Sequence, residues 1–135
     1  MSLTIYLAAP WVRKKDAAVV RQQLRDRGFN VTSRWIDLPD DSAQDDEKYM
    51  TSQAVVDLED VHNSDCVVVM NWEKSEGKAV EQGLAIAWDM PLLIVGDRSN
   101  IFQYLPSVLI VPTLDEAIIA LHNLEDLANA SPVEN

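Results

Sequence analysis

Residues 75–87 read Ser-Glu-Gly-Lys-Ala-Val-Glu-Gln-Gly-Leu-Ala-Ile-Ala, and this stretch decides how the rest of the chain is interpreted. It follows an apolar run and is typical of a tight turn that opens a helix. Gly77 lets the backbone turn sharply and approach a ligand closely. Glu81 is expected in or near the first helical turn, where the helix dipole favours a charged carboxylate. The pattern therefore predicts an ionised carboxylate at the carboxyl end of a parallel strand, where open α/β sheets bind ligands.

Composition and charge bound the class of protein. A chain of 135 residues suits one domain, and its 47% of apolar residues can fill one core. The formal net charge is −11, which argues against nonspecific binding to nucleic acid or to an anionic membrane surface. Seven of the 11 basic residues lie before position 35, so a local basic pocket for a small anion stays possible.

Cysteine and histidine usage gives no sign of a metal site. The single cysteine, Cys66, lies in an apolar run and excludes an intrachain disulfide, and His62 and His122 have no metal-ligand spacing. The first residues lack the features of a signal peptide, and no apolar run approaches the ~20 residues of a membrane span. We therefore expect a cytoplasmic protein with no metal and no cofactor.

Apolar runs and turn signals predict five strands and the helices between them. The strands are expected at residues 3–8, 29–34, 65–70, 91–95 and 108–111, and the helices at 12–27, 47–64, 75–89 and 113–129. The segment 35–46 is interpreted as a solvated acidic loop, or alternatively as a lid, and 100–106 as a second loop. The helix over 47–64 is expected to bury a stripe that contains Met50, Ala54, Leu58 and Val61.

The order β-α-β-α-β-α-β-α-β-α implies a parallel sheet with helices on both faces. Right-handed crossovers then favour the strand order 2-1-3-4-5, which is a doubly wound flavodoxin-like α/β domain. This single domain is expected to span residues 1–130, and residues 131–135 are expected to form a frayed tail.

Common ligand motifs are absent from the sequence. There is no G-x-G-x-x-G after the first strand, no G-x-x-x-x-G-K-[ST] and no G-x-S-x-G. The acids of a phospho-receiver are also missing from the ends of the first and third strands. What remains is Tyr6, Asp57 and Glu81, which could converge because the first and third strands are predicted neighbours. Two carboxylates and a phenol suit glycosidic chemistry.

Three motifs together resemble one known family. They are residues 5–11 (Ile-Tyr-Leu-Ala-Ala-Pro-Trp), residues 57–65 (beginning Asp-Leu-Glu-Asp-Val and ending Ser-Asp) and residues 77–85 (Gly-Lys-Ala-Val-Glu-Gln-Gly-Leu-Ala). They look like nucleoside 2-deoxyribosyltransferases and the related 2'-deoxynucleoside 5'-monophosphate N-glycosidases. The resemblance runs from the first strand to the Gly96 turn and more loosely into the last helix.

The resemblance implies cleavage or transfer at the N-glycosidic bond of a 2'-deoxynucleoside or its 5'-monophosphate. It implies Glu81 as the nucleophile, Asp57 as the assisting residue and Tyr6 as the residue that orients the nucleophile. From the residues alone, Glu81 could instead be an acid that complements the helix dipole, and Tyr6 could be plain core. Asp57 could be a solvated helix charge, and a shifted register could exchange it for Glu59 or Asp60.

The resemblance also implies a substrate-binding set, formed by Ala9, Pro10, Trp11, Arg13, Ser75 and Gly77. Ser75 stands six positions before Glu81, where the nucleoside enzymes have an acid and the monophosphate glycosidases have a phosphate-binding serine. The first loop lacks the usual glycines of the glycosidases but is followed by residues 13–15 (Arg-Lys-Lys). Those basic residues either contact a phosphate or form a solvated helix start.

The implied partner is a small deoxynucleoside or deoxynucleotide, and neither a nucleic acid polymer nor a membrane. Because neighbouring subunits often complete the site in this family, we expect a homodimer or a higher homo-oligomer. Two other functions stay open: a noncatalytic nucleotide-binding or interaction domain, and a different small-molecule enzyme on the same scaffold.

Overall fold

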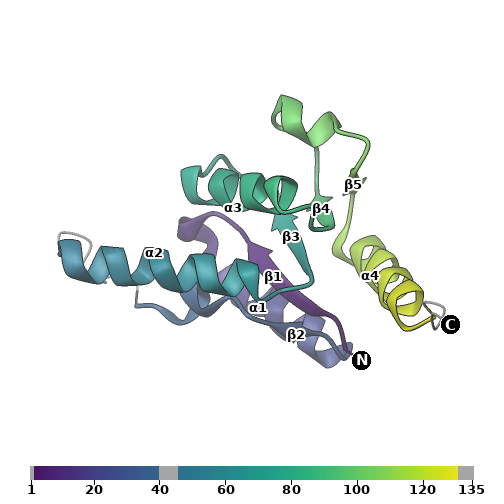
Figure 1. Ribbon diagram of the computed structural model, residues 1–135, viewed down its shortest axis with the longest axis horizontal. Helices are drawn as coiled ribbons and strands as arrows, with labels where there is room; N and C mark the ends of the chain where they lie inside the picture. The colour runs from purple at the N-terminus through teal and green to yellow at the C-terminus, as the bar shows by residue number, and fades with distance from the viewer. Residues whose placement is uncertain (1, 40–45, 131–135) are drawn as a thin grey trace, which may run out of the picture.

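Residues 2–39 and 46–130 are described by the computed structural model, and Figure 1 shows their arrangement. The strands in these residues are β1 (Thr4–Ala8), β2 (Asn30–Val31), β3 (Cys66–Met70), β4 (Leu92–Val95) and β5 (Val108–Val111). The helices are α1 (Lys14–Asp26), α2 (Glu47–His62), α3 (Glu76–Ala87) and α4 (Leu114–Asn129). Three short 3-10 helices are η1 (Trp11–Arg13), η2 (Arg34–Asp37) and η3 (Ile101–Tyr104).

The strands form one parallel sheet in the order β2-β1-β3-β4-β5, which confirms the predicted flavodoxin-like α/β fold. Every residue of β3 is buried, because this central strand is covered on both faces. At the edge, β5 leaves Leu109 48% exposed. Burial therefore distinguishes the central strand β3 from the edge strand β5, although both are continuous apolar runs.

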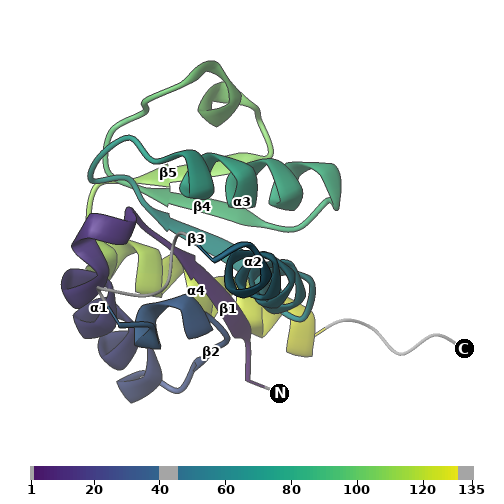
Figure 2. The ribbon, with the colours of Figure 1, turned by 90° about the vertical axis from the view of Figure 1, so that its left-hand side faces the viewer.

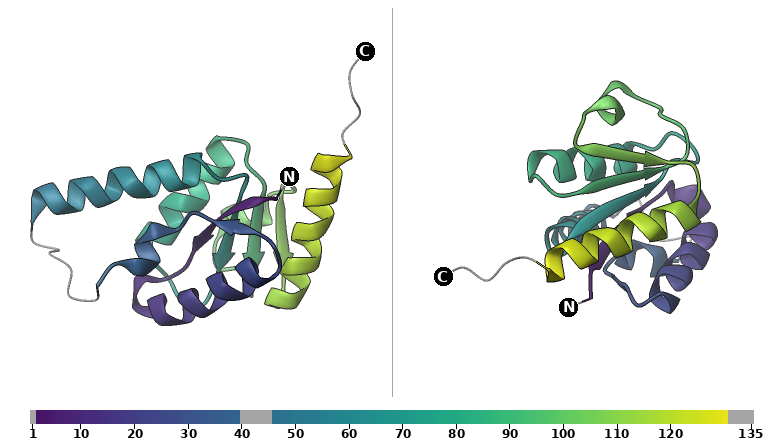
Figure 3. Two further views of the ribbon diagram at one scale, coloured as in Figure 1. Left: turned by 90° about the horizontal axis from the view of Figure 1, so that it is seen from below. Right: turned by 90° about the vertical axis from the view of Figure 1, so that its right-hand side faces the viewer.

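Helices cover both faces of the sheet. Figure 3 shows α1 and α4 on one face, and Figure 2, in which α2 is seen nearly end-on, shows α2 and α3 on the other. The neighbouring strands β1 and β3 thus lead to helices on opposite faces. Their connections diverge beyond the carboxyl ends of the strands, which is where a doubly wound sheet opens a crevice.

The segment after β2 differs from the prediction. β2 has two residues, because Arg34–Asp37 turn into the helix η2. Trp35 and Ile36 are each only 5% exposed, and the Trp35 Nε1–H donates to the Leu7 carbonyl at 3.0 Å. The expectation of a solvated loop is therefore wrong for this part, since two large apolar side chains enter the core. Residues 40–45 of the predicted loop and the predicted tail 131–135 lie outside the described residues.

The predicted stripe of α2 is also wrong for most of its length. Val61 is fully buried, but Met50 is 43% and Leu58 45% exposed. For the start of the helix, Figure 1 shows the reason: the first turns of α2 extend beyond the sheet, so no strand lies beneath them. The alternation also implied a helix between β4 and β5, where the structure has only the short helix η3.

Candidate functional site

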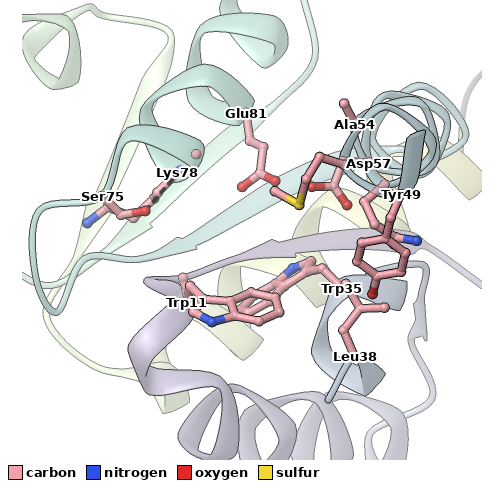
Figure 4. Close-up of a pocket in the computed structure, with 13 residues that line it drawn as sticks. Trp11, Trp35, Leu38, Tyr49, Ala54, Asp57, Ser75, Lys78 and Glu81 are labelled. Atoms are coloured by element: carbon pink, nitrogen blue, oxygen red, sulfur yellow. Dashed lines mark hydrogen bonds between the residues drawn. The ribbon is translucent and has the colours of Figure 1, made fainter. Parts of the chain in front are cut away.

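A cleft of about 410 Å³ lies at the carboxyl edge of the sheet, beside the ends of β1 and β3 (Figure 4). Its walls are the segment after β1, the helix η2, one side of α2 and the start of α3. The residues that line it are Ala9, Trp11, Trp35, Leu38, Tyr49, Met50, Gln53, Ala54, Asp57, Ser75, Gly77, Lys78 and Glu81. Its position is the one that the divergence between β1 and β3 predicts.

Tyr6 and Glu81 meet at the base of this cleft. The Tyr6 side chain is fully buried, and its hydroxyl donates a hydrogen bond to the Glu81 carboxylate, which is 8% exposed. Burial raises the pKa of Glu81 to about 8; the Tyr6 hydrogen bond acts against this rise, and the charge of Asp57 adds to it. Burial and the Glu81 charge raise the pKa of Tyr6 in turn, so the phenol stays a donor.

These observations correct the expectation that a helix dipole holds Glu81 ionised. Glu81 lies in the second turn of α3, because the helix begins at Glu76. The dipole acts mainly on the first turn. Burial is the largest influence on the carboxyl and works in the opposite direction, toward the protonated form.

Asp57 faces Glu81 across the cleft, as Figure 4 shows. It is half-buried on α2. Burial and the neighbouring charge of Asp60 raise the pKa of Asp57 to about 6, while the positive charge of Arg34 lowers it. The cleft therefore holds two carboxyl groups with raised pKa values, an arrangement that suits acid–base work near neutral pH.

The register of α2 decides between Asp57, Glu59 and Asp60. Glu59 is exposed and lies 3.5 Å from the Arg34 guanidinium. Asp60 is 4% exposed and accepts from Arg34 Nε at 2.9 Å. Of these three side chains, Asp57 is the one that lines the cleft.

Two tryptophans form an apolar floor (Figure 4). The centroids of the Trp11 and Trp35 rings are 6.3 Å apart, with the planes tilted by 36°. Lys14 links this floor to Leu38, because its Nζ lies 4.1 Å from the Trp11 centroid and donates to the Leu38 carbonyl. Trp11 was among the predicted residues. Trp35 was missed because the sequence placed it in a solvated loop.

The predicted substrate-binding residues divide into two groups. Four of them line the cleft: Ala9, Trp11, Ser75 and Gly77. Pro10 is fully buried and Arg13 is turned away, and neither is part of the lining.

The surroundings of Arg13 explain its position. Its Nε lies 2.5 Å from Asp16, its Nη1 lies 3.4 Å from Glu73, and its guanidinium lies 4.5 Å from the centre of the Trp72 ring. The expected phosphate contact would require Arg13 to leave these partners.

Lys78 is the charged lining residue that sequence reasoning missed. It is 6% exposed, and its Nζ donates to Asn71 Oδ1 at 2.8 Å and to the Glu73 carbonyl. Burial lowers the pKa of Lys78. Its backbone N–H donates to Ser75 Oγ at 3.3 Å, which caps α3. Lys78 stands three residues before Glu81, and this helical spacing, which puts both on one side of α3, is the signal that could have identified it.

Residues of α2 were missed for a different reason. The lining residues Tyr49, Met50, Gln53 and Ala54 stand one and two turns before Asp57. Helical spacing from Asp57 would have identified this side of the helix. The apolar stripe was instead assigned to the core.

Two general features of the described residues bear on chemistry. In residues 2–39 and 46–130, no three side chains among His, Cys, Asp and Glu are grouped so that they could hold a metal ion. Within the same residues, none of the helices has the length and apolar character needed to span a membrane.

Comparisons with known proteins place the fold. No family model and no curated protein sequence matches the chain. The structure is similar to that of a 2-deoxyribosyltransferase from Bacillus psychrosaccharolyticus, with 21% sequence identity, 87% of this chain and 95% of that chain covered, and a TM-score of 0.71. It is also similar to a conserved protein from Enterococcus faecalis V583, with 17% identity, coverage of 92% and 99%, and a TM-score of 0.66. The chain therefore has, over nearly its whole length, the fold on which a 2-deoxyribosyltransferase is built.

Proposed function

We propose that this protein cleaves or transfers at the N-glycosidic bond of a 2'-deoxynucleoside or its 5'-monophosphate, with Glu81 as the nucleophile. The observation that carries the proposal is the pairing of Glu81 with the buried Tyr6 hydroxyl while Asp57 faces it across one cleft. The fold shared with a 2-deoxyribosyltransferase and the three sequence motifs support the same reaction.

The groups of the cleft suit a two-step displacement. One oxygen of the Glu81 carboxylate bonds to C1' of the sugar, and the bond from C1' to the base nitrogen breaks with its electron pair going to the base. Asp57 gives its proton to the departing base. Water or a second base then attacks C1' and gives a proton to the Asp57 carboxylate, and the ester bond breaks with its electron pair returning to Glu81. Tyr6 binds the carboxylate during this exchange and fixes its orientation.

The shape and lining of the cleft fit the same substrate. A volume of about 410 Å³ lies within the usual range for small-molecule sites, roughly 300–1,000 Å³. The Trp11 and Trp35 rings offer an aromatic surface for a flat base. A sugar without a 2'-hydroxyl is the preferred substrate, because the missing hydroxyl eases positive charge development at C1'.

The test is direct. The protein is incubated with deoxynucleosides and deoxynucleoside monophosphates, with and without a free acceptor base, and base release or exchange is followed by chromatography. We expect turnover in the wild type and none in Glu81→Gln. No base release or exchange from any of these compounds would overturn the reaction. Tight nucleotide binding that Glu81→Gln leaves unchanged, without turnover, would support a noncatalytic binding domain.

A further inference from the structure

An ion pair joins two walls of the cleft. Asp60, on α2, is 4% exposed and is surrounded by donors from Arg34, the first residue of η2. The Arg34 backbone N–H donates to one carboxylate oxygen at 3.0 Å, and its Nε and Nη2 lie 2.9 and 2.8 Å from the other. Buried acids are seldom found without such partners, because an unpaired charge away from water is costly.

The position of this pair links it to the reacting groups. Asp60 stands one turn after Asp57 on the same helix, and Arg34 directly precedes Trp35 on the floor of the cleft. The Thr32 hydroxyl also donates to the Asp60 carbonyl at 3.0 Å. The pair therefore fastens α2 to η2 beside Asp57.

Two charges act on the pKa of Asp57: Asp60 on α2 itself and Arg34 on η2. Two further titratable groups face it from other elements, Glu81 on α3 and the uncharged phenol of Tyr6 on β1, and the Asp57 charge raises the pKa of both. Asp60 favours the protonated form of Asp57 and Arg34 favours the ionised form. The two members of the ion pair thus act on Asp57 in opposite directions.

We propose that Arg34 and Asp60 are a positioning pair for Asp57: together they hold α2 over the cleft and balance the charge that the Asp57 carboxyl meets. The inference deepens the proposed function, on which its catalytic meaning rests. Neither residue touches the cleft, so both act through Asp57.

The test uses two variants that break the same ion pair but change the charge in opposite directions. Arg34→Gln removes a positive charge, so the ionisation of Asp57 moves to higher pH. Asp60→Asn removes a negative charge, so the ionisation of Asp57 moves to lower pH. We expect shifts on the order of half a pH unit each, reduced by solvent near the exposed guanidinium. They are read from the acid limb of the kcat/KM profile and from a carbon-13 NMR titration of the Asp57 carboxyl.

Two controls separate charge from structure. Arg34→Lys keeps the positive charge and is expected to keep the wild-type profile. Glu59→Gln removes an acid from the neighbouring exposed position, and we expect a smaller shift than in Asp60→Asn. If Arg34→Gln does not fold, the comparison of Asp60→Asn with Glu59→Gln tests the proposal instead, and equal shifts in these two variants would overturn it.

Shifts of the Asp57 ionisation in opposite directions in Arg34→Gln and Asp60→Asn support the positioning pair. Shifts in the same direction, or no shift in folded variants, overturn it. Because the NMR titration needs no turnover, opposite NMR shifts in a protein that releases no base would retain the charge balance and reject only the proposed reaction.

Discussion

Proton affinity at two carboxyl groups is the main physical constraint on this site at the scale of single residues. Burial raises the pKa of Glu81 to about 8 and that of Asp57 to about 6, so Glu81 holds a proton more tightly than Asp57 does. The reaction requires the reverse, an ionised Glu81 and a protonated Asp57. When the pair holds one proton, most molecules therefore carry it on Glu81, and the smaller population with the proton on Asp57 is the reactive one. The two groups titrate as a unit.

This gives a prediction for the pH dependence. In the wild type, kcat/KM should rise through about pH 6, as one proton leaves the pair, and fall above about pH 8, as the second leaves. In Asp57→Asn only Glu81 titrates and its ionised form is active, so activity should rise with pH and then stay level. Its maximum should be on the order of a hundredfold lower, because the proton donor is gone. Initial rates between about pH 5 and 9.5 check both profiles; an alkaline limb that persists in Asp57→Asn would contradict the assignment.

Burial of Glu81 also makes a prediction for stability. The folded-state pKa of about 8 lies above the ordinary value of 4.5. The folded protein therefore binds this proton more tightly, and stability is lost as pH rises from 4.5 towards 8. Glu81→Gln keeps an acceptor for Tyr6 but cannot ionise. We expect it to be more stable than the wild type at pH 8.5, by at least ~1 kcal/mol, and the difference to shrink at pH 5.5. Urea unfolding at these two pH values, both above the pI of about 4.4, measures it; a difference that does not grow with pH would refute the idea.

The phosphate hypothesis makes a prediction for Arg13. A 5'-monophosphate should bind more tightly than its nucleoside, and Arg13→Ala should remove most of that difference, on the order of tenfold to a hundredfold. The guanidinium would have to exchange Glu73, 3.4 Å away, for the phosphate. Calorimetric titration with both ligands tests this, with Lys15→Ala as the control because Lys15 is exposed and carries the same charge. Equal affinity of the wild type for the two ligands would remove the phosphate site and favour a nucleoside substrate.

At the scale of elements, the sequence predicts those strands and helix starts that a local pattern of residues determines. The central strands are continuous apolar runs, and α3 begins at a serine cap, so β1, β3 and the start of α3 could be placed from the sequence alone. These elements also carry Tyr6 and Glu81. That part of the candidate site was therefore predictable as soon as β1 and β3 were expected to be neighbours.

The parts that failed depend on tertiary packing. Trp35 and Ile36 stand in a polar segment with no period, and only the packed structure shows that they enter the core. The stripe of α2 has helical spacing, but the sheet ends before the first turns of the helix, so spacing alone could not show which side is covered. The hydrogen bonds that turn Arg13 towards Asp16 likewise depend on side-chain directions that no motif contains.

At the scale of the whole molecule, the helices α2 and α3, which cover one face of the sheet, have several exposed apolar side chains. On α2, Leu58 is 45% exposed, and on α3 Val80 is 59% exposed. Trp88, just after α3, is 42% exposed and packs edge-on against His62, with ring centroids 5.5 Å apart. A surface helix normally presents polar residues outward, so such a face is expected to be covered.

We therefore keep the prediction of a homodimer or higher homo-oligomer and assign it to this face. For the wild type at micromolar concentration, sedimentation should give at least twice the chain mass of 15.1 kDa. Leu58→Glu places a charge in the apolar face, in a chain of net charge −11, and should shift the mass towards that of one chain. Ile119→Glu is the matched control, because Ile119 is 62% exposed on α4, which covers the opposite face of the sheet. A wild type that sediments as a single chain would contradict the oligomer, and equal dissociation by both substitutions would contradict the choice of face.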